Sequence, residues 1–260
     1  MKLRRLKEES GFTLIELLIV MVMTAFFTSL IMFFTFSYWR YGYSIAADLD
    51  TFVTRLNAGD VLREVVGTST GFITQNSIAD PRANNPESVG SGYWTVQHAI
   101  PGNTPVGATG TTTPLLYFRR FSLTTTGAYI LNGAQPYEDE YVLYLNGTTK
   151  QLLLRSIANP SATGNRLKSS CPKAVASSSC PEDKIVADNI VSVDKRFFSR
   201  SGNLVDWTSV YDATTSTYVG PDYSVVEVLE LTLNISKKAV FQTANTTQSS
   251  TIIRIALRNT

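Results

Sequence analysis

A long apolar segment near the amino terminus constrains this chain more than any other feature. From Phe12 to Trp39 the sequence has 28 residues, of which Glu16 alone is charged. Because a helix rises about 1.5 Å per residue, such a segment is longer than the roughly 30 Å hydrocarbon core of a bilayer. We therefore predict that residues 12–40 form a membrane-spanning helix.

A short basic leader precedes this segment. It carries two acidic residues and four basic ones, namely Lys2, Arg4, Arg5 and Lys7. Lys and Arg are enriched on the cytoplasmic side of membrane helices, so we expect a cytoplasmic leader and an extracytoplasmic C-terminal bulk. A secretory signal has its small-residue cleavage site after the apolar core, whereas here Gly11 comes before it. Cleavage after Gly11 would remove residues 1–11 and keep the apolar helix.

The sequence GFTLIE at residues 11–16, continued by LLIV, resembles the processing motif of type IV pilins and of type II secretion pseudopilins. The resemblance implies that a prepilin peptidase cuts after Gly11 and methylates the amine of Phe12. It also implies that the subunit waits in membrane lipid, and that an inner-membrane assembly platform then packs it with other pilin or pseudopilin subunits.

Glu16 is the one acidic residue inside the apolar segment. A carboxylate within a bilayer costs roughly 3 kcal/mol unless it is neutral or meets a cation. The new α-amine of Phe12 on a neighbouring subunit is a suitable partner, and this pair would set the axial register of assembly. Alternatively, Glu16 snorkels toward the cytoplasmic interface of an ordinary anchor helix.

A helical pattern continues beyond the membrane. Apolar side chains recur at Ile45, Leu49, Phe52 and Leu56, and they are followed by Val61, Leu62, Val65 and Val66. Spacings of three and four residues indicate an amphipathic helix. We expect residues 41–66 to extend the helix and to pack this face against a globular head.

Residues 67–260 change to short β-rich runs separated by Gly, Pro, Ser and Thr, which predicts an extracytoplasmic head of antiparallel strands and an α+β fold. Segments 76–92 and 101–113 have loop composition. The clearest hairpin has an Asn146-Gly147 turn signal. The strand candidates are 93–100, 115–123, 128–131, 141–145, 151–157, part of 184–200, 224–235 and 251–257.

One strand candidate alternates clearly. Its apolar residues are Val226, Val228, Leu229, Leu231, Leu233 and Ile235. We expect one buried face, with Glu227, Glu230, Thr232 and Asn234 mostly outside.

Two cysteines, Cys171 and Cys180, lie in a loop-like segment flanked by Pro172 and Pro181. Disulfides persist in exported proteins, so a disulfide is favoured over free thiols. A metal site is poorly supported, because two thiols need further ligands and the chain has a single histidine, His98.

The second half of the chain also bears on the kind of subunit. An apolar strand at 191–198, a turn at Ser201-Gly202-Asn203, Trp207 and a Val-rich strand at 225–235 resemble the ending of J-type pseudopilins and PilW-like minor pilins. Two ordinary strands joined by a loop would have a similar composition. Cleavage would leave 249 of the 260 residues, which is large for a repetitively polymerised pilin.

These features favour a minor pilin or pseudopilin in a complex that primes assembly at a filament tip. One alternative is a filament-associated adhesin or DNA-uptake receptor with a ligand-binding head. Another is a plain single-pass membrane protein, which would keep its leader.

Charge and residue types argue against other functions. The whole chain has 23 basic and 21 acidic residues, and removing the leader (four basic, two acidic) leaves 19 of each. A nucleic-acid binder normally shows a basic patch, and the pairs Arg119-Arg120 and Lys237-Lys238 are expected to be solvated strand ends. His98 lies in an ordinary strand pattern, and Glu138-Asp139-Glu140 is expected to be a solvated turn. We predict no enzyme activity and no cofactor.

Overall fold

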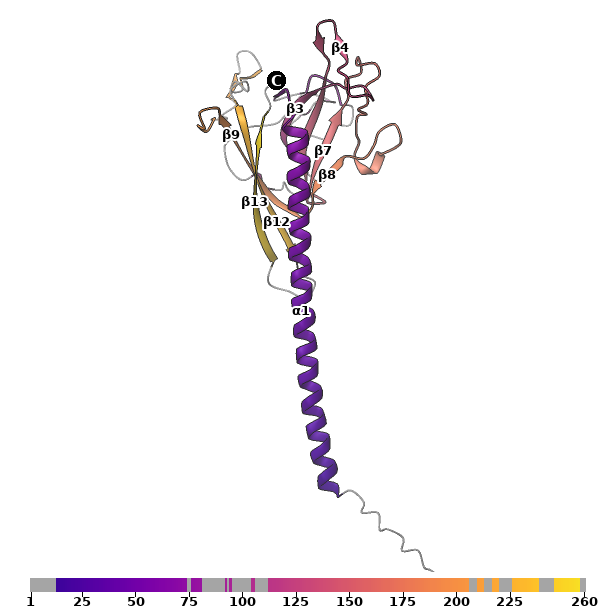
Figure 1. Ribbon diagram of the computed structural model, residues 1–260, viewed down its shortest axis with the longest axis vertical. Coiled ribbons are helices and arrows are strands. Elements are labelled where there is room, and N and C mark those ends of the chain that lie inside the picture. Colours follow the sequence, from indigo (N-terminus) through magenta and orange to yellow (C-terminus); the bar gives the residue numbers. More distant parts are fainter. Residues whose placement is uncertain are drawn as a thin grey trace, which may run out of the picture.

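The computed structural model describes residues 13–73, 76–80, 92, 94, 104–105, 112–205, 210–212, 217–219, 226–238 and 246–257. This part of the chain forms a long amino-terminal helix and a head of antiparallel β-sheets, which confirms the predicted α+β fold. Figure 1 shows the head around the upper end of the helix, with the lower part of the helix extending far away from it.

Helix α1 runs from Leu14 to Val66, as 53 uninterrupted residues. At about 1.5 Å per residue it is about 80 Å long. It ends at Gly67, whose N–H donates to the Arg63 carbonyl at 3.0 Å. The predicted continuous helix to Val66 is therefore confirmed, while its first predicted residue, Phe12, lies outside the described residues.

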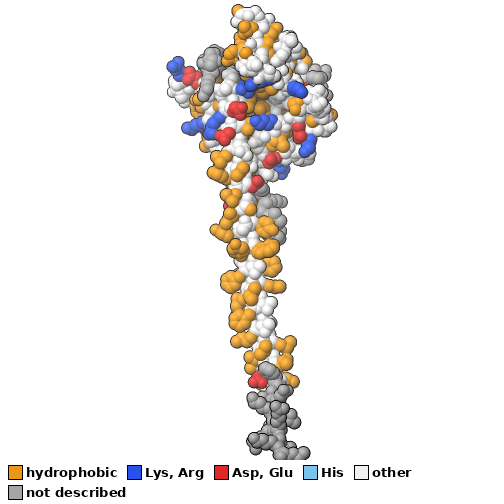
Figure 2. All heavy atoms as spheres, turned by 45° about the vertical axis from the view of Figure 1, so that its right-hand side comes forward, with side chains coloured by type: hydrophobic (Ala, Val, Ile, Leu, Met, Phe, Trp, Pro, Cys, Tyr) orange, Lys and Arg blue, Asp and Glu red, His pale blue; other side chains and the backbone are white. Residues whose placement is uncertain are grey.

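Within the described part of the chain, no residue of the lower part of α1, residues 14–40, is buried. The most apolar 18-residue window has a mean hydropathy of 2.5, and none of it is buried in the chain itself. Figure 2 shows hydrophobic side chains along this whole stretch, with a single acidic group near its lower end. By length and composition, α1 is able to cross a membrane.

Only the last two turns of α1 pack firmly on the head. Ala58, Leu62, Val65 and Val66 are buried, and α1 contacts β8 (Lys184–Ala187), β12 (Val226–Lys238) and β13 (Thr246–Ala256). The expectation that the whole apolar face packs on the head is wrong for its first half, because four of its side chains are 42–59% exposed: Ile45, Leu49, Phe52 and Leu56. At about 100° per residue, the mean direction of these four side chains lies about 110–170° away from Ala58, Leu62 and Val65.

Two sheets flank the upper end of α1 (Figure 1). The first has the order β1-β3-β6-β7-β8, and the second has the order β13-β12-β9-β2. All of their strand pairs are antiparallel. The remaining bounds are β1 Gly71–Phe72, β2 Thr104–Pro105, β3 Thr112–Phe121, β6 Glu138–Asn146, β7 Gln151–Ile157 and β9 Ile190–Ser199.

Short elements complete the described part of the head. They are the pair β4 (Leu131–Asn132) and β5 (Gln135–Pro136), the pair β10 (Val210–Asp212) and β11 (Thr217–Val219), and the 3₁₀ turn η1 (Lys173–Val175).

The β6–β7 hairpin is present as predicted, with a longer turn than the Asn-Gly signal indicates. Asn146 pairs with Gln151, so the connection has four residues. The Asn146 side chain accepts the N–H groups of Thr148 and Thr149 at 2.9 and 3.1 Å. Lys150 adopts the left-handed region, with φ of 55°. The asparagine therefore shapes the turn from its first position rather than from its centre.

The main core lies between the two sheets and the end of α1. It joins Leu62 of α1 to Leu143 of β6 and Leu231 of β12. In β12 the predicted alternation is confirmed for the buried side chains Leu229, Leu231, Leu233 and Ile235.

One outward residue of β12 departs from the expectation. Glu230 is 4% exposed, and it is covered by Arg254 of the neighbouring strand β13, whose Nε donates to the Glu230 carboxylate at 2.7 Å. This cross-strand pair excludes water from a position that the alternation assigns to the solvent side.

Several other segments refine the predicted strand pattern. The 184–200 candidate divides into β8 and β9, and Asn189, with φ of 58°, lies where the chain passes from one sheet to the other. Segment 101–113, expected as a loop, contains β2 and the start of β3. Candidate 128–131 contributes only the first residue of β4. Of candidate 93–100, which includes His98, the structure describes only Trp94, and this residue is not in a strand. Trp207 also lies outside the described residues.

Candidate functional site

The start of α1 places Glu16 beside the amino end of the helix. The Thr13 N–H and hydroxyl donate to the Glu16 carboxylate at 3.0 and 2.9 Å, and the Glu16 N–H donates to the Thr13 hydroxyl at 3.3 Å. This is a capping box, for which T-L-I-E is the sequence signature, although our sequence reasoning did not use it. Gly11 and Phe12, the predicted cleavage site, lie outside the described residues.

Four hydroxyl groups within the apolar part of α1 donate to carbonyls of the helix itself. The hydroxyls of Thr24, Thr28 and Thr35 each donate to the carbonyl four residues earlier, at 2.7–2.8 Å. Ser29 donates to the Phe26 carbonyl at 2.8 Å. These four hydroxyl groups can therefore enter an apolar environment with their donors satisfied.

Above this segment, α1 carries an apolar surface that we call the outward stripe, formed by Ile45, Leu49, Phe52 and Leu56. Its members are 42%, 59%, 54% and 52% exposed. At about 100° per residue, all four project within about 60° of the direction of Glu16. The stripe and Glu16 thus lie on one side of the helix, and a single straight partner could contact both.

The head contains a buried polar cluster that the sequence reasoning missed. Arg155 of β7 is 1% exposed, and its guanidinium contacts Asp183 at 2.7 Å and Asp80 at 3.0 Å. It also lies 5.2 Å from the ring of Trp94 and 5.7 Å from that of Tyr144. The available signal was a charged residue in the centre of the apolar strand QLLLRSI.

The electrostatics of this cluster favour a fixed arrangement. Burial alone would lower the pKa of Arg155, but the hydrogen bonds and charge of Asp183 raise it above its ordinary value. Burial, and then the charge of Asp183, raises the pKa of the Tyr144 hydroxyl, which donates to that carboxylate at 2.6 Å. Trp94 Nε1 donates to Asp80 at 2.8 Å. The cluster fastens residues 80 and 94 to the outer face of the first sheet.

The acidic run at 138–140 is not the solvated turn that we expected. All three residues begin β6, and Asp139 and Glu140 are 2% and 1% exposed. Glu140 accepts the Tyr117 hydroxyl at 2.8 Å and the Ile78 N–H at 2.9 Å. Arg119, expected at a solvated strand end, lies within β3 and donates to Glu140 at 3.3 Å.

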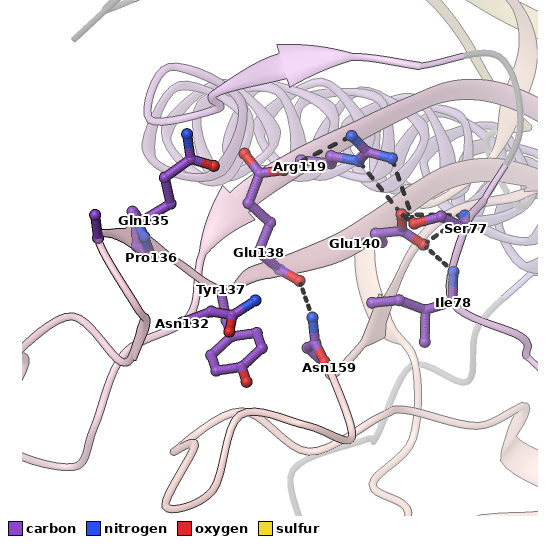
Figure 3. Close-up of a pocket in the computed structure, with 11 residues that line it drawn as sticks. Ser77, Ile78, Arg119, Asn132, Gln135, Pro136, Tyr137, Glu138, Glu140 and Asn159 are labelled. Carbon is purple, nitrogen blue, oxygen red and sulfur yellow. Dashed lines mark hydrogen bonds and ion pairs between the residues drawn. The ribbon is translucent and has the colours of Figure 1, made fainter.

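Figure 3 shows Ile78, Arg119 and Glu140 in the wall of a pocket of about 480 Å³ between β5 and residues 77–78. Arg119 also lies 3.7 Å from Glu138, and the Asn159 amide donates to the Glu138 carbonyl at 3.1 Å. The charged groups of this wall are thus engaged with one another. They connect the segment around Ser77 to the sheet.

Cys171 and Cys180 form a disulfide, with their Cα atoms 5.6 Å apart. Cys171 is buried, and its N–H and carbonyl bond to Pro181 and Asp183 at 2.8 and 2.9 Å. The disulfide loop is therefore attached to the segment that carries one of the carboxylates of the Arg155 cluster.

Comparison with known families places a processing signal at the start of the chain. Residues 6–32 match the family described as the prokaryotic N-terminal methylation motif. This match supports the superfamily of type IV pilins and pseudopilins, whose members are structural subunits rather than enzymes. Comparisons with curated proteins and with solved structures gave no match.

The matched residues include the first part of the exposed apolar helix described above. The motif implies processing by a prepilin peptidase and assembly with other pilin subunits. The helix fits a single-pass membrane anchor.

Proposed function

We propose that this protein is a minor pilin or pseudopilin, a structural subunit of a type IV pilus or type II secretion filament. The observation that carries the proposal is the methylation motif at residues 6–32, whose residues from Leu14 onward begin a helix with an exposed apolar lower part. Such a helix needs lipid before assembly and protein neighbours after it.

Maturation would divide the chain into functional parts. Cleavage after Gly11 removes the cytoplasmic leader 1–11, and methylation modifies the amine of Phe12. Residues 12–40 then serve as the membrane anchor and filament core, residues 41–66 as its extension, and residues 67–260 as the extracytoplasmic head.

Glu16 would act as the register residue. Its capping contacts with Thr13 keep the carboxylate at the amino end of α1, the region where a free amine at Phe12 would also lie. A protonated amine on a neighbouring subunit could form an ion pair with the same carboxylate. This pair would offset the free-energy cost of burying the carboxylate. The amine–carboxylate pair fixes how far one helix is displaced along the next.

The outward stripe supports helix-to-helix packing above the membrane. It is apolar, it faces away from the head, and it continues the side of α1 that carries Glu16. A neighbouring helix that reaches Glu16 would cover Leu49 and Phe52 along the same line. Burying apolar side chains in this way stabilises assembly at roughly 25 cal/mol per Å².

A minor position near the filament tip is supported by the head. It is large, and β9 and β12 are neighbouring antiparallel strands, with a turn at Gly202 following β9. This arrangement is compatible with the resemblance of 191–235 to J-type and PilW-like subunits.

The test is the mass of the amino-terminal peptide from membrane-extracted protein, in cells with and without the prepilin peptidase. We expect a peptidase-dependent start at N-methylated Phe12. An intact Met1 leader in both strains would overturn the proposal.

A further inference from the structure

A second concave surface lies where the end of α1 meets the first sheet and the disulfide loop. It has a volume of about 390 Å³. Part of its lining is apolar, with contributions from Val65 of α1, Leu154 of β7 and Leu167. We call this surface the basic pocket, for the charged residues that surround it.

Four cationic side chains and one carboxylate line the basic pocket, which gives a formal charge of 4 − 1 = +3. The cations are Arg120, Arg166, Lys168 and Lys184, and the carboxylate belongs to Glu182. The chain without its leader has 19 basic and 19 acidic residues. This concentration of positive charge is therefore local rather than a property of the whole molecule.

The contacts of these cations differ from those of other arginines in the head. Arg119, Arg155 and Arg254 each contact a carboxylate that is at most 5% exposed. Among the described residues, the four pocket cations make no ion pair. The Arg120 guanidinium lies 5.6 Å from the Tyr141 ring, and the Lys168 ammonium donates to the Ser178 carbonyl at 3.1 Å. Their charge remains available to an external anion.

We propose that the basic pocket binds an acidic, aliphatic segment of a neighbouring subunit's polypeptide. The cations would meet its carboxylates, and Val65, Leu154 and Leu167 would meet its aliphatic side chains. A pocket of this size accommodates a few side chains. The inference rests on the proposed function, since it names a contact within the filament.

The distance of the pocket from the membrane interface argues against a phospholipid headgroup as the anion. Val65 follows Tyr43, three residues beyond the predicted membrane segment 12–40, by 22 residues. In a continuous helix this corresponds to about 33 Å beyond the membrane interface. Both the position and the apolar floor therefore favour a protein carboxylate.

Isothermal titration calorimetry on the full-length protein in nonionic detergent tests this inference. The probe is a blocked hexapeptide that alternates glutamate with leucine, compared with its glutamine counterpart and with inorganic phosphate. We expect saturable binding of the acidic peptide that weakens as salt is raised, because salt screens exposed charges. We expect no binding of the glutamine peptide.

The matched variants are R166Q/K184Q in the pocket and K150Q/R200Q elsewhere on the surface of the head. The first should lower affinity about tenfold, and the second should leave it within about twofold. Circular dichroism verifies that both variants are folded.

Three results would overturn the inference: no saturable binding, equal loss in both variants, or phosphate competing as well as the peptide does. None depends on the amino-terminal mass, so this inference can fail while the proposed function stands.

Discussion

The head and the lower part of α1 differ in whether the chain itself buries their apolar side chains and pairs their charged groups. In the head, apolar side chains pack in a core, and even charged groups such as Arg155 and Glu140 have buried partners within the chain. In α1 before Ala58, apolar side chains are exposed, including the outward stripe. The described core of the head is formed by the chain alone, whereas the lower part of the helix requires an environment that the described chain does not supply.

This difference separates two kinds of experiment. Substitutions in the head should change the stability of the isolated protein. Substitutions in the outward stripe should leave that stability unchanged and act only when subunits meet.

Replacing Arg155 with Met should destabilise the head by about 3–5 kcal/mol, because Asp80 and Asp183 would lose a buried cation. Urea unfolding of the full chain in detergent, followed by fluorescence, measures the change. The control is R200M, since Arg200 and Glu227 are 90% and 38% exposed and lie 3.8 Å apart. An exposed pair of this kind contributes less than about 1 kcal/mol. Equal effects of the two variants would contradict the role of the cluster.

Leu62 and Leu49 offer a matched pair on one helix. L62A should cost about 2–4 kcal/mol, because Leu62 is fully buried against the head. L49A should change the free energy of unfolding by less than about 0.5 kcal/mol, because Leu49 is 59% exposed. L49A should nevertheless reduce incorporation into filaments, measured by shearing and immunoblotting. Comparable unfolding effects would mean that the stripe packs within the subunit.

Removing the disulfide with C171A/C180A should lower stability by about 2–3 kcal/mol, from the chain entropy of a closed loop of about ten residues. The same urea titration measures it, with the reduced wild-type protein as a second comparison. A wild-type protein whose unfolding midpoint is unaffected by reductant would contradict this prediction.

Lys195 should make the stability of the head depend on pH. Its ammonium donates to the Leu115 carbonyl at 2.6 Å, and burial lowers its pKa to about 7. Between pH 7 and the ordinary value of 10.5, the unfolded chain binds more protons than the folded chain, so stability rises with pH in this window.

We expect a gain on the order of 1–2 kcal/mol between about pH 7 and pH 9, measured by urea unfolding. K195M should be more stable than wild type near neutral pH and should lack most of this slope. A slope that persists unchanged in K195M would assign the pH dependence to another group.

Much of the architecture could be predicted because local pattern determines it. The uninterrupted apolar run predicts α1, and the Asn146-Gly147 signal predicts the β6–β7 hairpin. Alternation from Leu229 to Ile235 predicts the buried face of β12. The processing motif could be recognised in the same way, because it is a short contiguous sequence.

The remaining features depend on residues that are distant in the sequence. Nothing near Arg155 indicates that Asp80, 75 residues earlier, completes its cluster. The buried state of Glu140 likewise follows from Ser77 and Ile78. Periodicity identified an apolar face on residues 45–66 but could not show what packs against it. We therefore expected the whole face to pack on the head, whereas only its second half does so.

The most direct test of the outward stripe is photo-crosslinking in cells from position 52, where Phe52 is replaced with a photoreactive phenylalanine analogue. The matched control is Asn57, which is exposed and projects about 110° from the stripe. We expect an adduct with a second processed pilin-type subunit from position 52, dependent on the prepilin peptidase and on Glu16, and little or none from position 57. Equal adducts from both positions, or none from position 52 in assembled filaments, would contradict it.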